Sequence, residues 1–194
     1  MNGQTTVDYR NFFYPPGGIL IWIIILVEWI TFGAALLALT ISSRENPELY
    51  HRSRMLLNPV YGTVNTLFLL TAGYFMALGV HRAKEGLWQA AARAVSWAMA
   101  GGLLFVVLKS IEYYEKIQHG LTMGYNKFFS FYWLLTGFHL VHVLVGLGIL
   151  FFLYLSLRRK GKHPDLLNLE AGAAFWHMVD LIWLMLFPML YLVF

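Results

Sequence analysis

Long apolar runs, separated by short polar stretches, dominate the pattern of this chain. Five such runs can be recognised, at about residues 18–41, 61–80, 94–111, 128–157 and 171–193. An α-helix rises about 1.5 Å per residue, so about 20 apolar residues cross the hydrocarbon core of a bilayer. The stretches between the runs carry charged and turn-forming residues, which are typical of loops at a membrane surface. The sequence therefore predicts an all-α integral membrane bundle of five transmembrane helices, forming a single domain over residues 1–194.

The last apolar run contains polar groups that are costly inside a membrane. His177 and Asp180 stand three residues apart, so they project from one face of the helix, about one turn from each other. An ionised Asp near the centre of a bilayer costs roughly 2.5–3.5 kcal/mol on insertion scales. We therefore expect this face to meet protein. Pro188 removes one backbone hydrogen bond near the end of the run, and neighbouring helices can accommodate the resulting kink.

Composition agrees with a polytopic membrane protein and excludes several kinds of site. Apolar residues make up 59% of the chain and charged residues only 12%. The chain contains no Cys, which excludes disulfides, thiolate metal sites and Cys nucleophiles. The formal net charge of +4 is modest and is not concentrated in one stretch. We therefore expect loops that touch anionic lipid head groups, and no nucleic-acid binding.

The distribution of Lys and Arg predicts the orientation, because cytoplasmic loops are enriched in these residues. The bias favours a cytoplasmic N-terminus and a periplasmic C-terminus. The inner side then holds Arg10, Arg82, Lys84, Arg93, Arg158, Arg159, Lys160 and Lys162, and the outer side holds Arg44, Arg52, Arg54, Lys116 and Lys127. Next to the fourth run, Arg158, Arg159 and His163 form either a solvated collar at the membrane surface or a site for a lipid phosphate.

This topology places several ionisable residues at a similar depth. Glu28 lies near the midpoint of the first run, His142 near that of the fourth and Asp180 near that of the fifth. A charged group that faces lipid at this depth is costly. We therefore expect the buried polar residues to line surfaces between helices, or a cleft filled with lipid or water. These residues are Glu28, His139, His142, His177 and Asp180.

Three interpretations of these polar residues remain open at this point. Imidazole and carboxylate groups on facing helices are ligands of iron, copper and zinc, and two His residues can hold a haem. Alternatively, Glu28 and Asp180 carry protons in a small transporter, although no inverted repeat is visible. In the third interpretation, imidazoles and hydrogen-bonded carboxyl groups fix the register of the helices in a structural subunit. The residues alone favour this third interpretation.

Several motifs occur in a fixed order from about residue 18 to the end of the chain. They are LIWIIILVEWITF at 20–32, VNTLFLLTAG at 64–73, KSIEYYE at 109–115, FSFYWLLTGFHLVHVLVG at 129–146, EAGA at 170–173 and FWHMVDLIWLMLF at 175–187. They resemble motifs of subunit III of the haem-copper respiratory oxidases. That family has a helix with a buried Glu followed four residues later by Phe, then LNTxxLLxSG, QxxEYYE, TGFHGxHV, EAGA and WHFVDxxWLFLF.

The resemblance implies a short, five-helix bacterial form of this subunit, which spans the inner membrane several times. Such a subunit is not catalytic and binds no haem, copper or other metal itself. It packs directly against subunit I, in a complex with subunit II and other respiratory subunits that carry the haem and copper. It stabilises subunit I of a proton-pumping oxidase and holds structural phospholipids in a cleft. Glu28 corresponds to the family's buried cleft carboxylate, and the matching polar positions are His139, His142, Glu170, His177 and Asp180.

A charged residue departs from the family pattern. Lys109 stands where the family has Gln, three residues before Glu112. A pair at this spacing near a helix end contributes only a few tenths of a kcal/mol. We interpret Lys109 as a residue whose aliphatic stem lies in the bilayer while its ammonium group reaches the membrane surface.

Two alternative functions remain. Within the family, the chain also resembles the accessory subunit of a nitric-oxide reductase, which shares the five-helix length and much of the motif set. From a different class, a free-standing membrane transporter or redox enzyme would use the buried acids and imidazoles directly.

Overall fold

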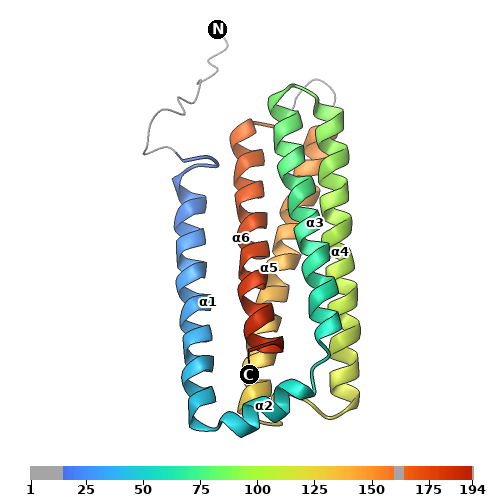
Figure 1. Cartoon of the computed structure of the whole chain (residues 1–194). Coiled ribbons are helices and arrows are strands. Elements are labelled where there is room, and N and C mark those ends of the chain that lie inside the picture. The colour runs from blue at the N-terminus through green and yellow to red at the C-terminus, as the bar shows by residue number, and fades with distance from the viewer. Residues whose placement is uncertain (1–14, 160–163, 194) are drawn as a thin grey trace.

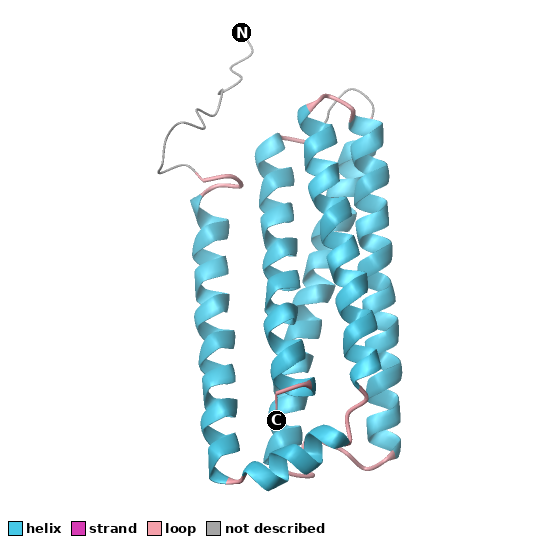
Figure 2. Cartoon of the chain, viewed as in Figure 1, coloured by secondary structure: helices cyan, strands magenta, loops and turns pink. Residues whose placement is uncertain are grey.

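A computed structural model of the chain describes residues 15–159 and 164–193. Within these ranges it has six α-helices and no β-strand (Figure 1, Figure 2). The helices are α1 (Ile19–Glu45), α2 (Pro47–Met55), α3 (Pro59–Lys84), α4 (Trp88–Gln118), α5 (Lys127–Arg158) and α6 (Leu166–Tyr191). In the described part of the chain, five of them, all except α2, are long and apolar enough to cross a membrane. The predicted all-α class, with five helices able to cross a membrane, is confirmed.

The transmembrane helices extend beyond the apolar runs that predict them. α4 covers Trp88–Gln118, whereas its apolar run covers 94–111, and α6 begins at Leu166, before the predicted start at 171. Charged residues such as Arg93 and Glu115 continue the helix at these ends. Their polar groups can reach the membrane surface while their stems stay against the helix. The apolar run therefore marks the part of a helix that suits the hydrocarbon core, and not the whole helix.

The short helix α2 lies in a stretch that the sequence pattern predicts as a loop. The Asn46 side chain caps its N-terminus by accepting a hydrogen bond from a backbone N–H of the first turn, and Pro47 begins the helix. Asn58 and Pro59 begin α3 in the same way. A capping Asn followed by Pro is a strong signal for a helix start. α2 lies across one end of the bundle and connects α1 to α3 (Figure 1).

Each long helix runs antiparallel to the long helix before it in the chain (Figure 1). α6 packs against α1, α3 and α5, while α4 packs against α3 and α5. α1 stands at the edge of the bundle and packs against α5 and α6. The first buried residue of α1 is Phe32, so the N-terminal half of this helix is largely exposed. α1 begins at one end of the bundle, and α6 ends toward the other.

Small residues on α4 and α5 form a slot for an indole ring of α6. Trp176 is fully buried. A Cβ atom at Gly102 would lie 2.5 Å from Cη2 of this ring, and a Cβ atom at Gly146 would lie 3.0 Å from its Cε3. Helices in membranes approach closely where their contact residues are small. The slot thus holds α4, α5 and α6 together around one side chain.

Candidate functional site

The polar residues that the sequence places inside the membrane do not form one site. The structure distributes them over the α1–α5 interface, the α3–α6 interface and the core between α4, α5 and α6. Among residues 15–159 and 164–193, no group of three or more His, Asp or Glu side chains is arranged to hold a metal ion. Each group is therefore described by its own contacts.

Glu28 and His142 meet between α1 and α5. Glu28 Oε1 lies 3.1 Å from His142 Nε2, and both side chains are largely buried. His142 Nδ1 lies 2.9 Å from the Phe138 carbonyl oxygen. A carbonyl oxygen only accepts hydrogen bonds, so Nδ1 carries a hydrogen and Nε2 faces the carboxyl group. The pair can therefore share one proton, either as a neutral hydrogen bond or as an ion pair. Phe32 packs edge-on against the His142 ring, with 5.7 Å between ring centroids.

His139 serves as an aromatic packing surface in the core. It is fully buried, and its ring stacks on Trp183 with 5.3 Å between centroids. Phe105 contacts the ring edge-on from α4. Neither ring nitrogen of His139 has a hydrogen-bond partner among the described residues. In this position the imidazole joins α4, α5 and α6 through its aromatic contacts.

His177 and Asp180 lie together on α6, on the side that faces α3. His177 Nδ1 is 3.6 Å from Asp180 Oδ2. The Asp180 carboxylate lies directly on α3 at Gly73, where a Cβ atom would collide with it. Asp180 Oδ1 has no hydrogen-bond partner in the described chain. These two residues are next to each other, as their spacing predicts, but they face α3 and not the pair of Glu28 and His142.

Glu170 lies at the start of α6 and pairs with α3. Lys84 Nζ, at the end of α3, is 2.7 Å from Glu170 Oε1. The Glu170 side chain is buried, whereas the Lys84 side chain is half exposed. This ion pair fixes one end of the α3–α6 interface.

Arg158 and Arg159 lie at the end of α5, beside a hollow of about 650 Å³. The opposite wall comes from the start of α4 and includes Trp88 and Arg93. Arg158 Nη1 donates to the Tyr154 hydroxyl at 3.0 Å. Three Arg residues thus border one hollow at the end of the bundle where α1 begins. His163, the remaining residue of the predicted collar, lies outside the described residues.

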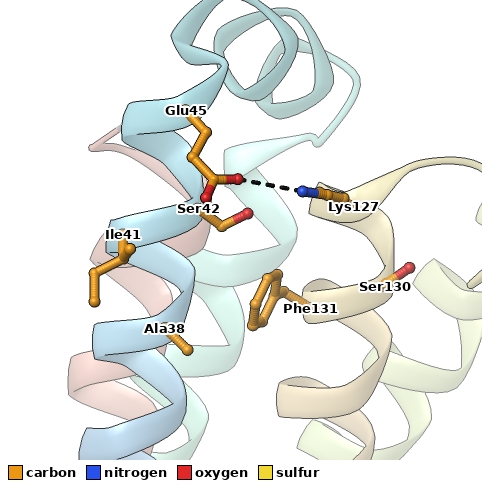
Figure 3. Close-up of a pocket in the computed structure, with 7 residues that line it drawn as sticks. All are labelled: Ala38, Ile41, Ser42, Glu45, Lys127, Ser130 and Phe131. Carbon is orange, nitrogen blue, oxygen red and sulfur yellow. Dashed lines mark hydrogen bonds and ion pairs between the residues drawn. The ribbon is translucent and has the colours of Figure 1, made fainter.

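A second hollow, of about 490 Å³, lies at the other end of α5, against the end of α1 (Figure 3). Lys127 Nζ pairs with Glu45 Oε2 at 3.2 Å across its mouth. Ser42 and Ser130 add hydroxyl groups, while Phe131 and the small and aliphatic residues of α1 make the rest apolar. This hollow therefore combines a polar mouth with an apolar wall.

The interpretation of Lys109 as a residue that reaches the membrane surface is wrong. Its side chain is 0% exposed. Lys109 Nζ donates to Glu112 Oε2 at 2.9 Å, to the Tyr191 hydroxyl at 2.9 Å and to the Tyr132 hydroxyl at 3.2 Å. Tyr191 and Tyr132 in turn donate to Glu112 Oε1 at 2.6 and 3.0 Å. All three ammonium hydrogens have acceptors, and both carboxylate oxygens have donors.

The interpretation of Lys109 is wrong because α4 is longer than the apolar run that predicts it. The apolar run ends at about residue 111, which would place Lys109 at a helix terminus. α4 continues to Gln118, so Lys109 lies more than two turns inside the helix. The residues from Glu112 to Gln118 contain no Pro or Gly, so nothing in the sequence ends the helix at residue 111. The buried network of Lys109, Glu112, Tyr132 and Tyr191 joins α4, α5 and α6.

Comparison with known proteins adds an independent result. The sequence profile described as cytochrome c oxidase subunit III matches residues 21–193. Cytochrome c oxidase subunit 3 of Corynebacterium diphtheriae is 30% identical over 179 residues, which cover 88% of this chain and 85% of the relative. A probable cytochrome c oxidase subunit 3 of Mycobacterium leprae is 31% identical over 129 residues, covering 66% of this chain and 64% of the relative.

Another relative is longer than this chain. Cytochrome c oxidase subunit 3 of Mycosarcoma maydis is 33% identical over 131 residues, which cover 66% of this chain but only 46% of the relative. This chain therefore spans about half the length of that protein. The profile match covers nearly all of the helical bundle, from α1 to α6. The chain belongs to the cytochrome c oxidase subunit III family.

Proposed function

We propose that the chain acts as the non-catalytic subunit III of a proton-pumping haem-copper terminal oxidase in a bacterial inner membrane. The observation that carries this proposal is the similarity to the Corynebacterium diphtheriae subunit over most of both chains. In this role the chain packs against subunit I, in a complex that also contains subunit II. The haem and copper belong to these partners, and the chain contributes stability to subunit I during aerobic electron transport.

Purification through a tag on this chain tests the proposal. In a mild detergent, the tagged chain should bring down a haem-bearing partner, detected by its Soret absorption and by oxygen consumption. The chain expressed alone should fold as a helical protein without Soret absorption and without stoichiometric metal. Haem or metal bound to the isolated chain, or an absence of haem-bearing partners in the native membrane, would contradict it.

The proposed orientation has a cytoplasmic N-terminus and a periplasmic C-terminus. It is supported by Arg93, Arg158 and Arg159, which lie at the end of the bundle where α1 begins. Residues of this kind are enriched on the cytoplasmic side. Lys127 and the hollow beside it then lie toward the periplasm.

We also propose that the chain holds phospholipid along the face between α1 and α5. The hollow at Lys127 supports this proposal, since it has an ammonium group and two hydroxyl groups at its mouth and an apolar wall behind them. Farther along the same interface, Glu28 Oε1 lies 3.1 Å from His142 Nε2. An acyl chain in this face would lie against Phe131 and Phe138, whose side chains line the interface.

Replacement of Glu28 with Gln tests the role of this face. The variant keeps the size of the side chain but cannot form an ion pair with His142. A hydrogen bond to a charged group contributes about 1.5–3 kcal/mol and a neutral one about 0.5–1.5 kcal/mol, so we expect a loss of only about 1 kcal/mol and an intact complex. Phospholipid retained per complex, or the number of turnovers before inactivation, should fall. Complete loss of assembly would instead show that Glu28 is needed for the fold.

The hollow beside Arg93, Arg158 and Arg159 is proposed to bind the phosphate of an anionic phospholipid. Each basic residue near a membrane surface contributes about 1 kcal/mol to attraction of anionic lipid. The double variant Arg93→Gln/Arg158→Gln should therefore bind anionic phospholipid about 30-fold more weakly, as measured by native mass spectrometry across a lipid titration. Arg52→Gln is the matched control, because Arg52 is 77% exposed on α2 and lies away from the hollow. Equal retention in both variants would contradict the assignment.

A further inference from the structure

A mainly apolar hollow separates the first half of α1 from α6. Its volume is about 540 Å³, and its lining includes Trp22 and Trp29 on α1 and Ala174 and His177 on α6. None of residues 19–31 is buried, so this half of α1 stands away from its neighbours. The His177 side chain is 41% exposed. The end of the hollow nearest the start of α1 leads toward the membrane surface, where water is present.

The turn that precedes α1 lies against α6 at this end. Gly17 and Gly18 have left-handed backbone angles, with φ of +81° and +83°, which Gly adopts without strain. A Cβ atom at Gly17 would lie 2.8 Å from Ala171 Cα and 2.9 Å from the Ala171 backbone nitrogen. Both of these atoms belong to the backbone of α6, so they cannot turn aside as a side chain can. Figure 2 shows the turn reaching from the start of α1 toward α6.

This contact is in line with the hollow. Ala171 precedes Ala174 by three residues, so both project from one face of α6. On the opposite wall, the Trp22 indole donates a hydrogen bond to the Pro16 carbonyl oxygen at 3.0 Å. The turn is therefore joined to both walls of the hollow, to α6 through Gly17 and to α1 through Trp22.

We infer that residues 15–18 form a clasp that closes the surface end of this hollow and keeps water out of it. The clasp depends on Gly17, because any side chain there would collide with the α6 backbone. Opening of the clasp would let α1 move away from α6 at this end and expose His177 to water. The contacts of α1 with α5 at Glu28 and Glu45 would remain. This property belongs to the chain itself and goes beyond the proposed function.

Labelling of a single cysteine tests the clasp. The chain has no native Cys, so Ala174→Cys places one thiol in the hollow, next to the clasp. A thiol in apolar surroundings is poorly ionised and reacts slowly. A sulfonated maleimide should therefore label this site slowly in lipid nanodiscs that hold the chain with the partners it brings down. Mass spectrometry identifies the label on this chain. Ala38→Cys, in the hollow between α1 and α5, is the reference site away from the clasp.

Two glycine substitutions separate the contact with α6 from backbone strain. Gly17→Ala adds a Cβ atom that collides with the α6 backbone, whereas at Gly18, with a similar φ, a Cβ atom meets nothing within 4 Å. In Gly17→Ala, the cysteine at position 174 should react about 5- to 150-fold faster, which corresponds to the usual cost of overpacking. In Gly18→Ala the rate should rise much less. The rate at position 38 should stay the same in both variants.

The indole of Trp22 provides an independent test. Trp22→Phe keeps an aromatic ring in the wall but removes the N–H group that bonds to Pro16. This variant should also speed the labelling of Ala174→Cys. Trp29→Phe is the matched control, because Trp29 lines the same hollow about two turns farther along α1. Its labelling rate should stay close to that of the original chain.

Three results would overturn the inference. If Ala174→Cys in the original chain reacts as fast as in the unfolded chain, the clasp does not keep water out. Equal rates in Gly17→Ala and Gly18→Ala would mean that the contact with α6 does not close the hollow. Faster labelling at both cysteine sites would show that α1 loosens as a whole. Thermal unfolding identifies any variant that fails to fold, and if Gly17→Ala is one, the comparison of Trp22→Phe with Trp29→Phe decides the question.

Discussion

Replacement of Lys109 with Met should lower the free energy of unfolding by about 3–5 kcal/mol, the range for breaking a buried ion pair by removal of one partner. Lys109 and Glu112 are both fully buried and are 2.9 Å apart. Met has a similar length, so the change removes the charge and three hydrogen bonds with little loss of packing. The Glu112 carboxylate would keep only the two hydroxyl groups of Tyr132 and Tyr191. The destabilisation is measured by thermal or denaturant unfolding of the chain in detergent.

A second substitution identifies the cause of this loss. In Lys109→Met/Glu112→Gln, the side chain at position 112 is neutral and can still accept hydrogen bonds from Tyr132 and Tyr191. The double variant should therefore be more stable than Lys109→Met alone, with an interaction energy well above the error of the measurement. If the double variant is the less stable of the two, an unpaired charge is not the reason for the loss.

The fold class is predictable because a bilayer fixes how many apolar residues a helix needs. The five runs mark five helices, but their ends could not be placed by apolar residues alone. α4 gains its extra length from residues such as Arg93 and Glu115, whose polar groups tolerate the membrane surface. The apolar pattern of the sequence also fails to predict α2. Its sequence, PELYHRSRM, is too polar to show an apolar pattern, and only Asn46 and Pro47 signal its start.

The partners of the buried polar residues are less predictable than their depth. The pairing of Glu28 with His142 depends on how α1 and α5 are rotated about their axes, and that rotation is set by packing against neighbours. Equal depth alone allows Asp180 to join them, yet it lies on α3 at Gly73. His177 and Asp180 are predicted as neighbours because one helix fixes their spacing. Contacts within a helix can thus be read from the sequence, whereas contacts between helices require the structure.

Replacement of Gly102 with Leu should destabilise the bundle by about 1–3 kcal/mol, the usual cost of overpacking a core. The added Cβ atom alone would lie 2.5 Å from Trp176 Cη2 and 2.8 Å from Leu147 Cδ2. Trp176 is fully buried, so its ring has no space to move away. Gly148→Leu on α5 is the matched control, because a Cβ atom there would meet nothing within 4 Å. The control variant should unfold at or slightly above the temperature of the original chain, since Leu favours a helix more than Gly does.

The shape of the slot gives this prediction a second test. Phe lacks the distal ring that carries Cη2, so Trp176→Phe should remove the main clash with a side chain at position 102. Alone, Trp176→Phe leaves a cavity and should destabilise the chain. Combined with Gly102→Leu, the two losses should partly cancel, because the larger side chain fills the space that the indole leaves. Strict additivity of the two losses, measured by thermal unfolding in detergent, would mean that Gly102 and Trp176 do not restrict each other.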